Sequence, residues 1–234
     1  FIQHGVTDMR TLINDLLELS RVNSAEPKIE AVDTGDVVEH VVDQLHADIE
    51  SSGATVEFGE LPTVDADARS LQQVFLNLIG NGTHALLRHP EQLELVRTDG
   101  SVDETVADEL LRYDSPVQTS GRRVMHDVEV AGQVIPSGEM VLTALGSANR
   151  DPRFWGDTAA DLDVSRADAN RHVSFGSGVH HCLGAALARM EGEIAITHLV
   201  RRFPDLALAD EPTFNARIIL RGREVLPVSL GSAA

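Results

Sequence analysis

The chain carries, at residues 175–184, the stretch Phe175-Gly176-Ser177-Gly178-Val179-His180-His181-Cys182-Leu183-Gly184, which decides its fold. Cys182 is the only cysteine of the protein. The glycines before Cys182 permit a tight loop, and Gly184 lets a helix begin against a flat partner. We predict that helix over residues 183–203, so Cys182 lies at its N-terminus, where the helix dipole and free N–H groups favour a thiolate. A thiolate held by backbone donors has the chemistry of an axial ligand to heme iron.

Three other interpretations of this cysteine have to be weighed. A lone cysteine is more often a small buried apolar residue than a ligand. Zinc is disfavoured, because the three consecutive residues His180 to Cys182 cannot converge on one tetrahedral centre. A cysteine–histidine nucleophile is conceivable, although no orienting acid or oxyanion loop follows at a suitable spacing.

Composition excludes several classes of protein. The 234 residues include 19 basic and 37 acidic side chains, a net charge of −18 with histidine neutral, so neither nucleic acid nor an anionic membrane is an expected partner. A single cysteine excludes an intrachain disulfide framework and a cysteine-rich zinc module. No apolar run approaches the roughly 18 residues of a membrane span, and the start of the chain has no basic segment typical of a signal peptide. We therefore expect a cytoplasmic protein or a piece of one.

Periodicity predicts a predominantly helical α+β fold with small antiparallel sheets. Helices are expected over 6–22, 36–52, 68–86, 91–98, 103–113 and 183–203. Strands are expected over 54–58, in an antiparallel sheet over 123–143, and over 218–228, and a turn with a strand edge is expected over 61–65. Residues 147–171 are polar and aperiodic, an unusually long irregular stretch of a kind that is often functional.

Residues from about 77 to 234 resemble the C-terminal part of a bacterial cytochrome P-450, a heme-thiolate monooxygenase. The family signature Phe-x-x-Gly-x-x-x-Cys-x-Gly is matched at Phe175, Gly178, Cys182 and Gly184. The segment Glu109-Leu110-Leu111-Arg112 matches the family's Glu-x-x-Arg helix, and Asn149-Arg150-Asp151-Pro152 opens a similar polar meander. The resemblance implies heme b as cofactor, a small hydrophobic substrate, and a ferredoxin or reductase as electron donor.

The same resemblance implies roles for particular side chains. Cys182 would be the axial ligand, with Phe175, Gly178 and Gly184 shaping the loop around the cofactor. Glu109 and Arg112 would pair with Arg166 to hold the meander beneath the heme. The heme propionates would be contacted, through charge-assisted hydrogen bonds, by Arg122, His172 and His180.

Residues 1–81 resemble a different family, the sensor histidine kinases. Residues 10–21 are similar to the second helix of the kinase dimerisation hairpin, and residues 61–81 to the approach to its ATP-binding motif. In that family, asparagines at the positions of Asn77 and Asn81 contact nucleotide phosphate and magnesium. We favour an exposed helix face for these two asparagines, because no phospho-acceptor histidine motif precedes them and no glycine-rich lid follows.

The two resemblances meet at Asn77-Leu78-Ile79-Gly80-Asn81, which fits both families, so we infer a chimera joined at this pentapeptide. In the monooxygenases an acid–threonine pair delivers protons just upstream of this point, and here Gln73 and Val74 occupy its place. We therefore predict a truncated heme-thiolate monooxygenase with no intact catalytic pair and impaired turnover. The alternatives are a kinase-derived signalling module that forms a homodimer through helix 6–22, or a fragment with no function of its own.

Overall fold

The computed structural model describes residues 30–33, 35–36, 39, 63–66, 68–182, 184–214 and 219–231. The expected helix 6–22, the expected strand 54–58 and most of the expected helix 36–52 lie outside these ranges. Within the described residues, no helix is long and apolar enough to cross a membrane.

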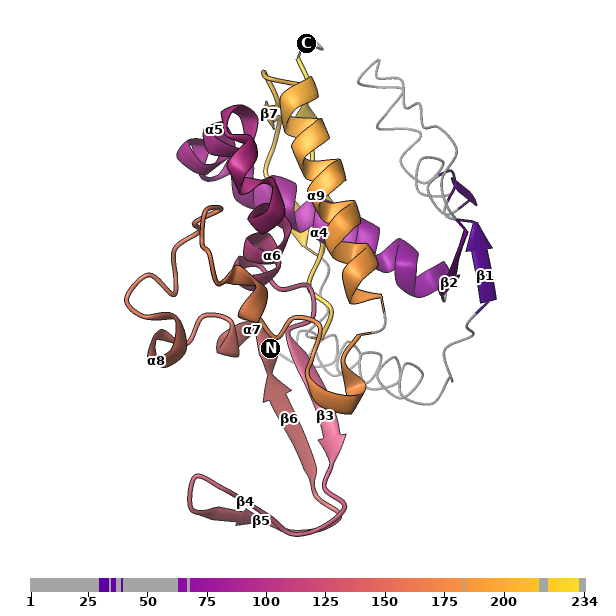
Figure 1. Cartoon of the computed structure of the whole chain (residues 1–234), viewed down its shortest axis with the longest axis vertical. Helices are drawn as coiled ribbons and strands as arrows, with labels where there is room; N and C mark the ends of the chain where they lie inside the picture. The colour runs from indigo at the N-terminus through magenta and orange to yellow at the C-terminus, as the bar shows by residue number, and fades with distance from the viewer. Residues whose placement is uncertain are drawn as a thin grey trace, which may run out of the picture.

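The helices and strands follow one another along the chain with irregular segments between them (Figure 1). The α-helices are α4 (Ala68–Leu87), α5 (Pro90–Thr98), α6 (Asp103–Tyr113), α7 (Leu145–Ala148), α8 (Pro152–Trp155) and α9 (Ala185–Arg202), and the 3-10 helices are η1 (Gly100–Val102), η2 (Ala169–Arg171) and η3 (Gly178–His180). The strands are β1 (Glu30–Asp33), β2 (Thr63–Ala66), β3 (Thr119–Arg123), β4 (Val128–Val130), β5 (Gln133–Ile135), β6 (Met140–Ala144), β7 (Ala207–Leu208), β8 (Thr213–Phe214), β9 (Arg223–Val225) and β10 (Val228–Ser229). The predicted helices from α4 onward are confirmed to within two residues at each end.

Three helices, α4, α6 and α9, cross at the centre of the molecule and enclose its core (Figure 1). Two glycines allow these helices to pack closely against one another. A Cβ atom at Gly82 of α4 would lie 2.8 Å from the Ile196 side chain, and one at Gly192 of α9 would lie 2.5 Å from Leu78. Each glycine costs a helix about 1 kcal/mol relative to alanine. The close packing of neighbouring side chains against the glycine backbone explains why glycine is used at these positions.

Antiparallel pairing is confirmed in the region 123–143, but as two separate pairs of strands instead of one sheet. Strand β3 pairs with β6, from Thr119 opposite Ala144 to Arg123 opposite Met140, while β4 and β5 form a hairpin. Figure 1 shows that hairpin beyond the far end of β3 and β6. The expected C-terminal strands are also confirmed, and they pair with two short strands that the periodicity did not predict: β10 with β7, and β9 with β8.

Candidate functional site

Two side chains in the C-terminal half of α6, Glu109 and Arg112, form a buried ion pair. Arg112 Nε donates to Glu109 Oε2 at 2.6 Å, and Arg112 Nη2 donates to Glu109 Oε1 at 2.8 Å. Neither side chain has any solvent exposure. Arg166 joins them, with its Nε 3.2 Å from Glu109 Oε2, so the structure brings together the three residues that the resemblance grouped.

This triad fastens the meander, which we define as residues 149–166, to α6. The remaining N–H groups of Arg112 donate hydrogen bonds to three backbone carbonyls of the meander. These are the carbonyls of Asn149 at 2.9 Å, Ala159 at 2.8 Å and Asp161 at 2.6 Å. A segment with so little regular structure leaves carbonyl groups without partners, and a guanidinium can satisfy several of them at once. The triad of Glu109, Arg112 and Arg166 therefore holds the meander in place.

The carboxylate and the second arginine complete the attachment. Glu109 Oε1 accepts a hydrogen bond from the Asp163 N–H at 2.9 Å, and Arg166 Nη2 donates to the Thr158 carbonyl at 3.0 Å. Burial of charged groups is tolerated here because each charge has both an ionic partner and further hydrogen bonds.

The cysteine loop, defined here as residues 172–184, follows the meander. The Cys182 N–H donates to the Phe175 carbonyl at 2.9 Å and closes the loop on itself. Gly176 and Gly178 have φ of 73° and 68°, a left-handed conformation that favours glycine over residues with a side chain. Cys182 itself is exposed, and it lies just outside α9, which begins at residue 185 instead of 183.

Two of the expected propionate contacts have accessible side chains. Arg122 is exposed on β3, where its Nη1 donates to Ser120 Oγ at 2.6 Å and to the Gly121 carbonyl at 2.8 Å. His180 is exposed in η3, beside Val179, which is 97% exposed. Both side chains are therefore open to solvent and free to meet a ligand.

The third expected contact, His172, lies in a different environment. This side chain is buried, its Nε2 lies 2.9 Å from Asp108 Oδ1, and its Nδ1 accepts from the Ser174 N–H at 3.1 Å. Because both ring nitrogens are used inside the protein, this geometry offers neither of them to a propionate. The sequence motif placed His172 near the loop correctly, but could not show in which direction its ring points.

The expectation of exposed asparagines on α4 needs correction. Asn77 is 4% exposed and Asn81 is 2% exposed. Asn81 Nδ2 donates to the Arg221 carbonyl at 3.1 Å, 140 residues away in the chain. Burial removes both side chains from solvent, so neither forms an exposed face and neither is presented to a nucleotide. The α4 backbone is helical through Gln73 and Val74, whose side chains lie outside the described set.

One buried acid was not found by sequence reasoning. Burial raises the pKa of Glu191 on α9 to about 7. Its Oε2 has no hydrogen-bond partner among the described residues. The sequence did not predict this, because Glu191 lies within a helix and belongs to no recognised motif.

The groups around Cys182 fit a heme better than a bare metal ion. A protein-bound metal ion needs several ligands, and the described residues contain no cluster of three or more His, Cys, Asp or Glu side chains that could hold one. A heme brings its own ring nitrogens and requires one axial donor, apolar contact and cations for its propionates. The exposed thiol of Cys182 offers the axial donor and the exposed Val179 offers apolar contact, while Arg122 is an exposed cation on β3.

Comparisons with known proteins point to one family. The Cytochrome P450 family model matches residues 102–217. The chain is 45% identical over 159 residues to the polyketide biosynthesis cytochrome P450 PksS of Bacillus subtilis, covering 66% of this chain and 39% of the relative. It is also 45% identical over 158 residues to the 6-deoxyerythronolide B hydroxylase of Saccharopolyspora erythraea, with the same two coverages of 66% and 39%.

Solved structures agree with the sequence relatives. The crystal structure of P450BioI, in complex with an acyl carrier protein ligated to hexadec-9Z-enoic acid, matches with a TM-score of 0.66 and 41% identity, covering 69% of this chain and 42% of that chain. The Bacillus subtilis PksS structure matches with a TM-score of 0.62 and 36% identity, covering 82% of this chain and 54% of that chain. The matched part of the chain is thus the C-terminal part of a cytochrome P450 fold.

The matches cover only part of each relative. The chain spans only 39% of the length of the curated relatives described above. None of these matches is to a histidine kinase, so the fusion predicted for residues 1–81 gains no support from them.

Proposed function

We propose that this chain is the heme-binding part of a cytochrome P450 monooxygenase, with Cys182 as the axial ligand of heme b. The observation that carries the proposal is the cysteine loop. The thiol of Cys182 is exposed to solvent, and the Cys182 N–H donates to the Phe175 carbonyl. The first residues of the loop are held on α6 by the hydrogen bond from Ser174 to the Leu111 carbonyl.

The chain's own residues supply binding and orientation. When bound, heme supplies the reductive activation of dioxygen on which a monooxygenase depends. Cys182 donates its sulfur, and the hydrogen bond from its own N–H to the Phe175 carbonyl limits where that sulfur can lie. Arg122 and His180 would donate to the heme propionates, and Gly178 and Gly184, which have no side chains, would leave room for the ring beside the loop.

The substrate and the electron donor follow from the same proposal. The family resemblance implies a small hydrophobic substrate and a ferredoxin or reductase as electron donor. A polyketide-biosynthesis cytochrome P450 and a hydroxylase are among the relatives. Turnover by this chain is impaired, because Gln73 and Val74 replace the acid and hydroxyl that act together in proton delivery.

A ferrous–carbonyl absorption spectrum of the heme-reconstituted chain tests the ligation. The wild type should show the red-shifted band that is characteristic of a thiolate ligand, and Cys182→Ala should lose it. A His181→Ala variant is the matched control, because it removes the neighbouring ligand-type side chain and should keep the band. Absence of the band in the wild type, or its survival in Cys182→Ala, would contradict the proposal.

The division of the chain belongs to the same proposal. We propose that residues 1–81 are a kinase-like segment, that residues 77–234 are the heme-binding region, and that two chains associate through residues 6–22. This assignment rests on the sequence pattern of residues 1–81 alone. Sedimentation that shows a strict monomer at high concentration would exclude the dimer.

A further inference from the structure

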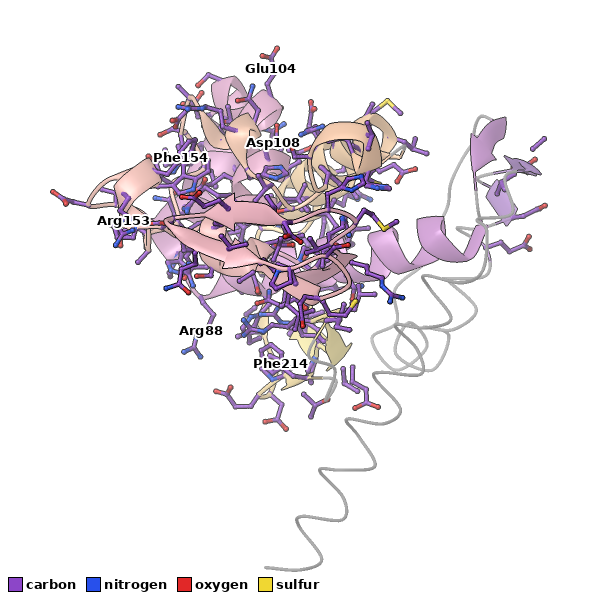
Figure 2. The ribbon with its side chains drawn as sticks, turned by 90° about the horizontal axis from the view of Figure 1, so that it is seen from below. Arg88, Glu104, Asp108, Arg153, Phe154 and Phe214 are labelled. Carbon is purple, nitrogen blue, oxygen red and sulfur yellow. The ribbon has the colours of Figure 1, made fainter. Side chains whose placement is uncertain are left out.

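Asp108 lies one residue before Glu109 on α6, but it faces another part of the molecule. Successive residues of a helix point about 100° apart, so the two neighbouring acids cannot serve the same partners. Asp108 Oδ1 accepts from His172 Nε2 at 2.9 Å and from Arg189 Nε at 2.6 Å. In Figure 2 it is labelled beside α9, which is seen almost end-on.

The two partners of Asp108 lie on opposite sides of the cysteine loop in the chain. His172 is the first residue of the loop, and Arg189 stands in the first half of α9, directly after it. One carboxylate oxygen therefore joins the entry and the exit of the loop to the same point on α6. Burial alone raises the pKa of Asp108, but the hydrogen bonds from His172 and Arg189, with the charge of Arg189, outweigh it and hold the pKa below its ordinary value.

The contacts continue from these partners into the loop. The Arg189 guanidinium lies over the Phe175 ring at 4.9 Å, and the His172 ring centroid is 5.5 Å from that of Phe175. The Phe175 carbonyl is the acceptor for the Cys182 N–H at 2.9 Å. A connected set of contacts thus runs from Asp108, through both partners and one aromatic ring, to the residue that carries the thiol.

Ser174 fixes the orientation of the histidine in this set. Its N–H donates to His172 Nδ1 at 3.1 Å, so the ring proton lies on Nε2 and is donated to Asp108. Its hydroxyl donates to the Leu111 carbonyl of α6 at 2.8 Å. The base of the loop is therefore tied to α6 by backbone and side-chain bonds together.

We propose that Asp108 is a positioning residue that sets the place of the Cys182 thiol, by joining His172 and Arg189 on either side of the cysteine loop. This inference builds on the proposed function, but it concerns the loop itself and can be tested without heme. It assigns different tasks to the adjacent acids of α6, Glu109 for the meander and Asp108 for the cysteine loop.

The chain offers a matched control for this role. Asp103, on the same helix, forms a bidentate pair with Arg201 of α9, with Oδ1 2.6 Å from Nη2 and Oδ2 2.9 Å from Nη1. It therefore joins the same two helices through the same pair of residue types, but away from the loop. Asp108→Asn with Asp103→Asn, and Arg189→Met with Arg201→Met, are the two pairs of variants to compare.

The first experiment uses the heme-free chain and follows hydrogen exchange of the Cys182 amide, together with alkylation of the single thiol by iodoacetamide. In Asp108→Asn and Arg189→Met the amide should exchange about tenfold faster or more, as expected when a buried charge-assisted hydrogen bond is lost, and the thiol should also react faster. The two control variants should stay within about twofold of the wild type.

The second experiment loads heme and measures the fraction of ferrous–carbonyl protein in the thiolate-type band at equal heme content. That fraction should fall in Asp108→Asn and be unchanged in Asp103→Asn. Equal amide exchange in the Asp108→Asn and Asp103→Asn variants would overturn the inference, and if Asp108→Asn does not fold, Arg189→Met decides it. Failure of the wild type to bind heme would contradict the proposed function, while the exchange result would still decide the role of Asp108.

Discussion

The meander and the cysteine loop are both irregular segments held against α6, yet they are held in different ways. The meander is attached through Glu109 and Arg112, whose side chains have no exposure. The cysteine loop is attached through Asp108, whose partner Arg189 has a side chain that is 32% exposed, and Cys182 itself is exposed. The difference indicates that the meander serves as fixed structure, whereas the loop is anchored at its base and left open at its tip. An open tip is what a residue that must bind a ligand requires.

The largest expected effect comes from Arg112→Ala. This change removes one of the two arginine partners of the buried Glu109 carboxylate and leaves only Arg166. It also leaves three meander carbonyls without their Arg112 donors. Breaking a buried ion pair costs about 3–5 kcal/mol, enough to unfold a domain of ordinary stability. Urea denaturation followed by circular dichroism measures the loss, and a loss below about 1 kcal/mol would show that the meander does not depend on this pair.

A smaller effect is expected on the loop from Gly178→Ala. The added Cβ would meet nothing within 4 Å, so any cost comes from its φ of 68°. A left-handed conformation costs a residue with a side chain about 1–2 kcal/mol. Because the strain is confined to the loop, iodoacetamide should react faster with Cys182 while the urea midpoint changes little. Gly80→Ala, in α4 and also without a neighbour within 4 Å, is the control and should not slow or speed alkylation.

Acid should weaken the attachment of the loop at Asp108. The folded-state pKa of Asp108 lies below its ordinary value of 3.8, so its stabilisation is present above about pH 4 and is lost as the pH falls through the folded pKa. The wild type should lose more stability than Asp108→Asn between about pH 6 and about pH 3. Urea midpoints of both proteins at the two pH values measure this difference. An equal loss in the two proteins would place the acid sensitivity elsewhere.

The smallest effect is expected from Arg171→Ala, just beyond the meander. Arg171 pairs with Asp168 at 3.6 Å and lies 4.4 Å over the Phe154 ring, but its side chain is 57% exposed. Figure 2 shows Phe154 at the edge of the molecule. Exposed contacts of these kinds contribute about 1 kcal/mol or less. A thermal unfolding midpoint that falls as far as that of Arg112→Ala would contradict the contrast drawn between buried and exposed arginines.

Much of the site could be predicted because its elements are local in the sequence. The spacing of Glu109 and Arg112 places both on one side of a helix, and the glycines around Cys182 predict a loop in any context. The direction of His172 could not be predicted, because it depends on Asp108, which is 64 residues away in the chain. The burial of Asn77 and Asn81 was missed for a similar reason, since α9 and the segment near Arg221 cover α4 only in the folded protein.

The sequence by itself determined the positions of helices α4, α5, α6 and α9, the single thiol and the Glu–Arg pair, because these follow from periodicity, composition and short spacings. Only the tertiary structure decided that Glu109 and Asp108 serve different segments, and that Cys182 stays exposed while His172 turns inward. The physical reason is that each of these outcomes depends on partners brought from distant parts of the chain to α6. Their hydrogen bonds satisfy buried charges that no local segment could satisfy alone.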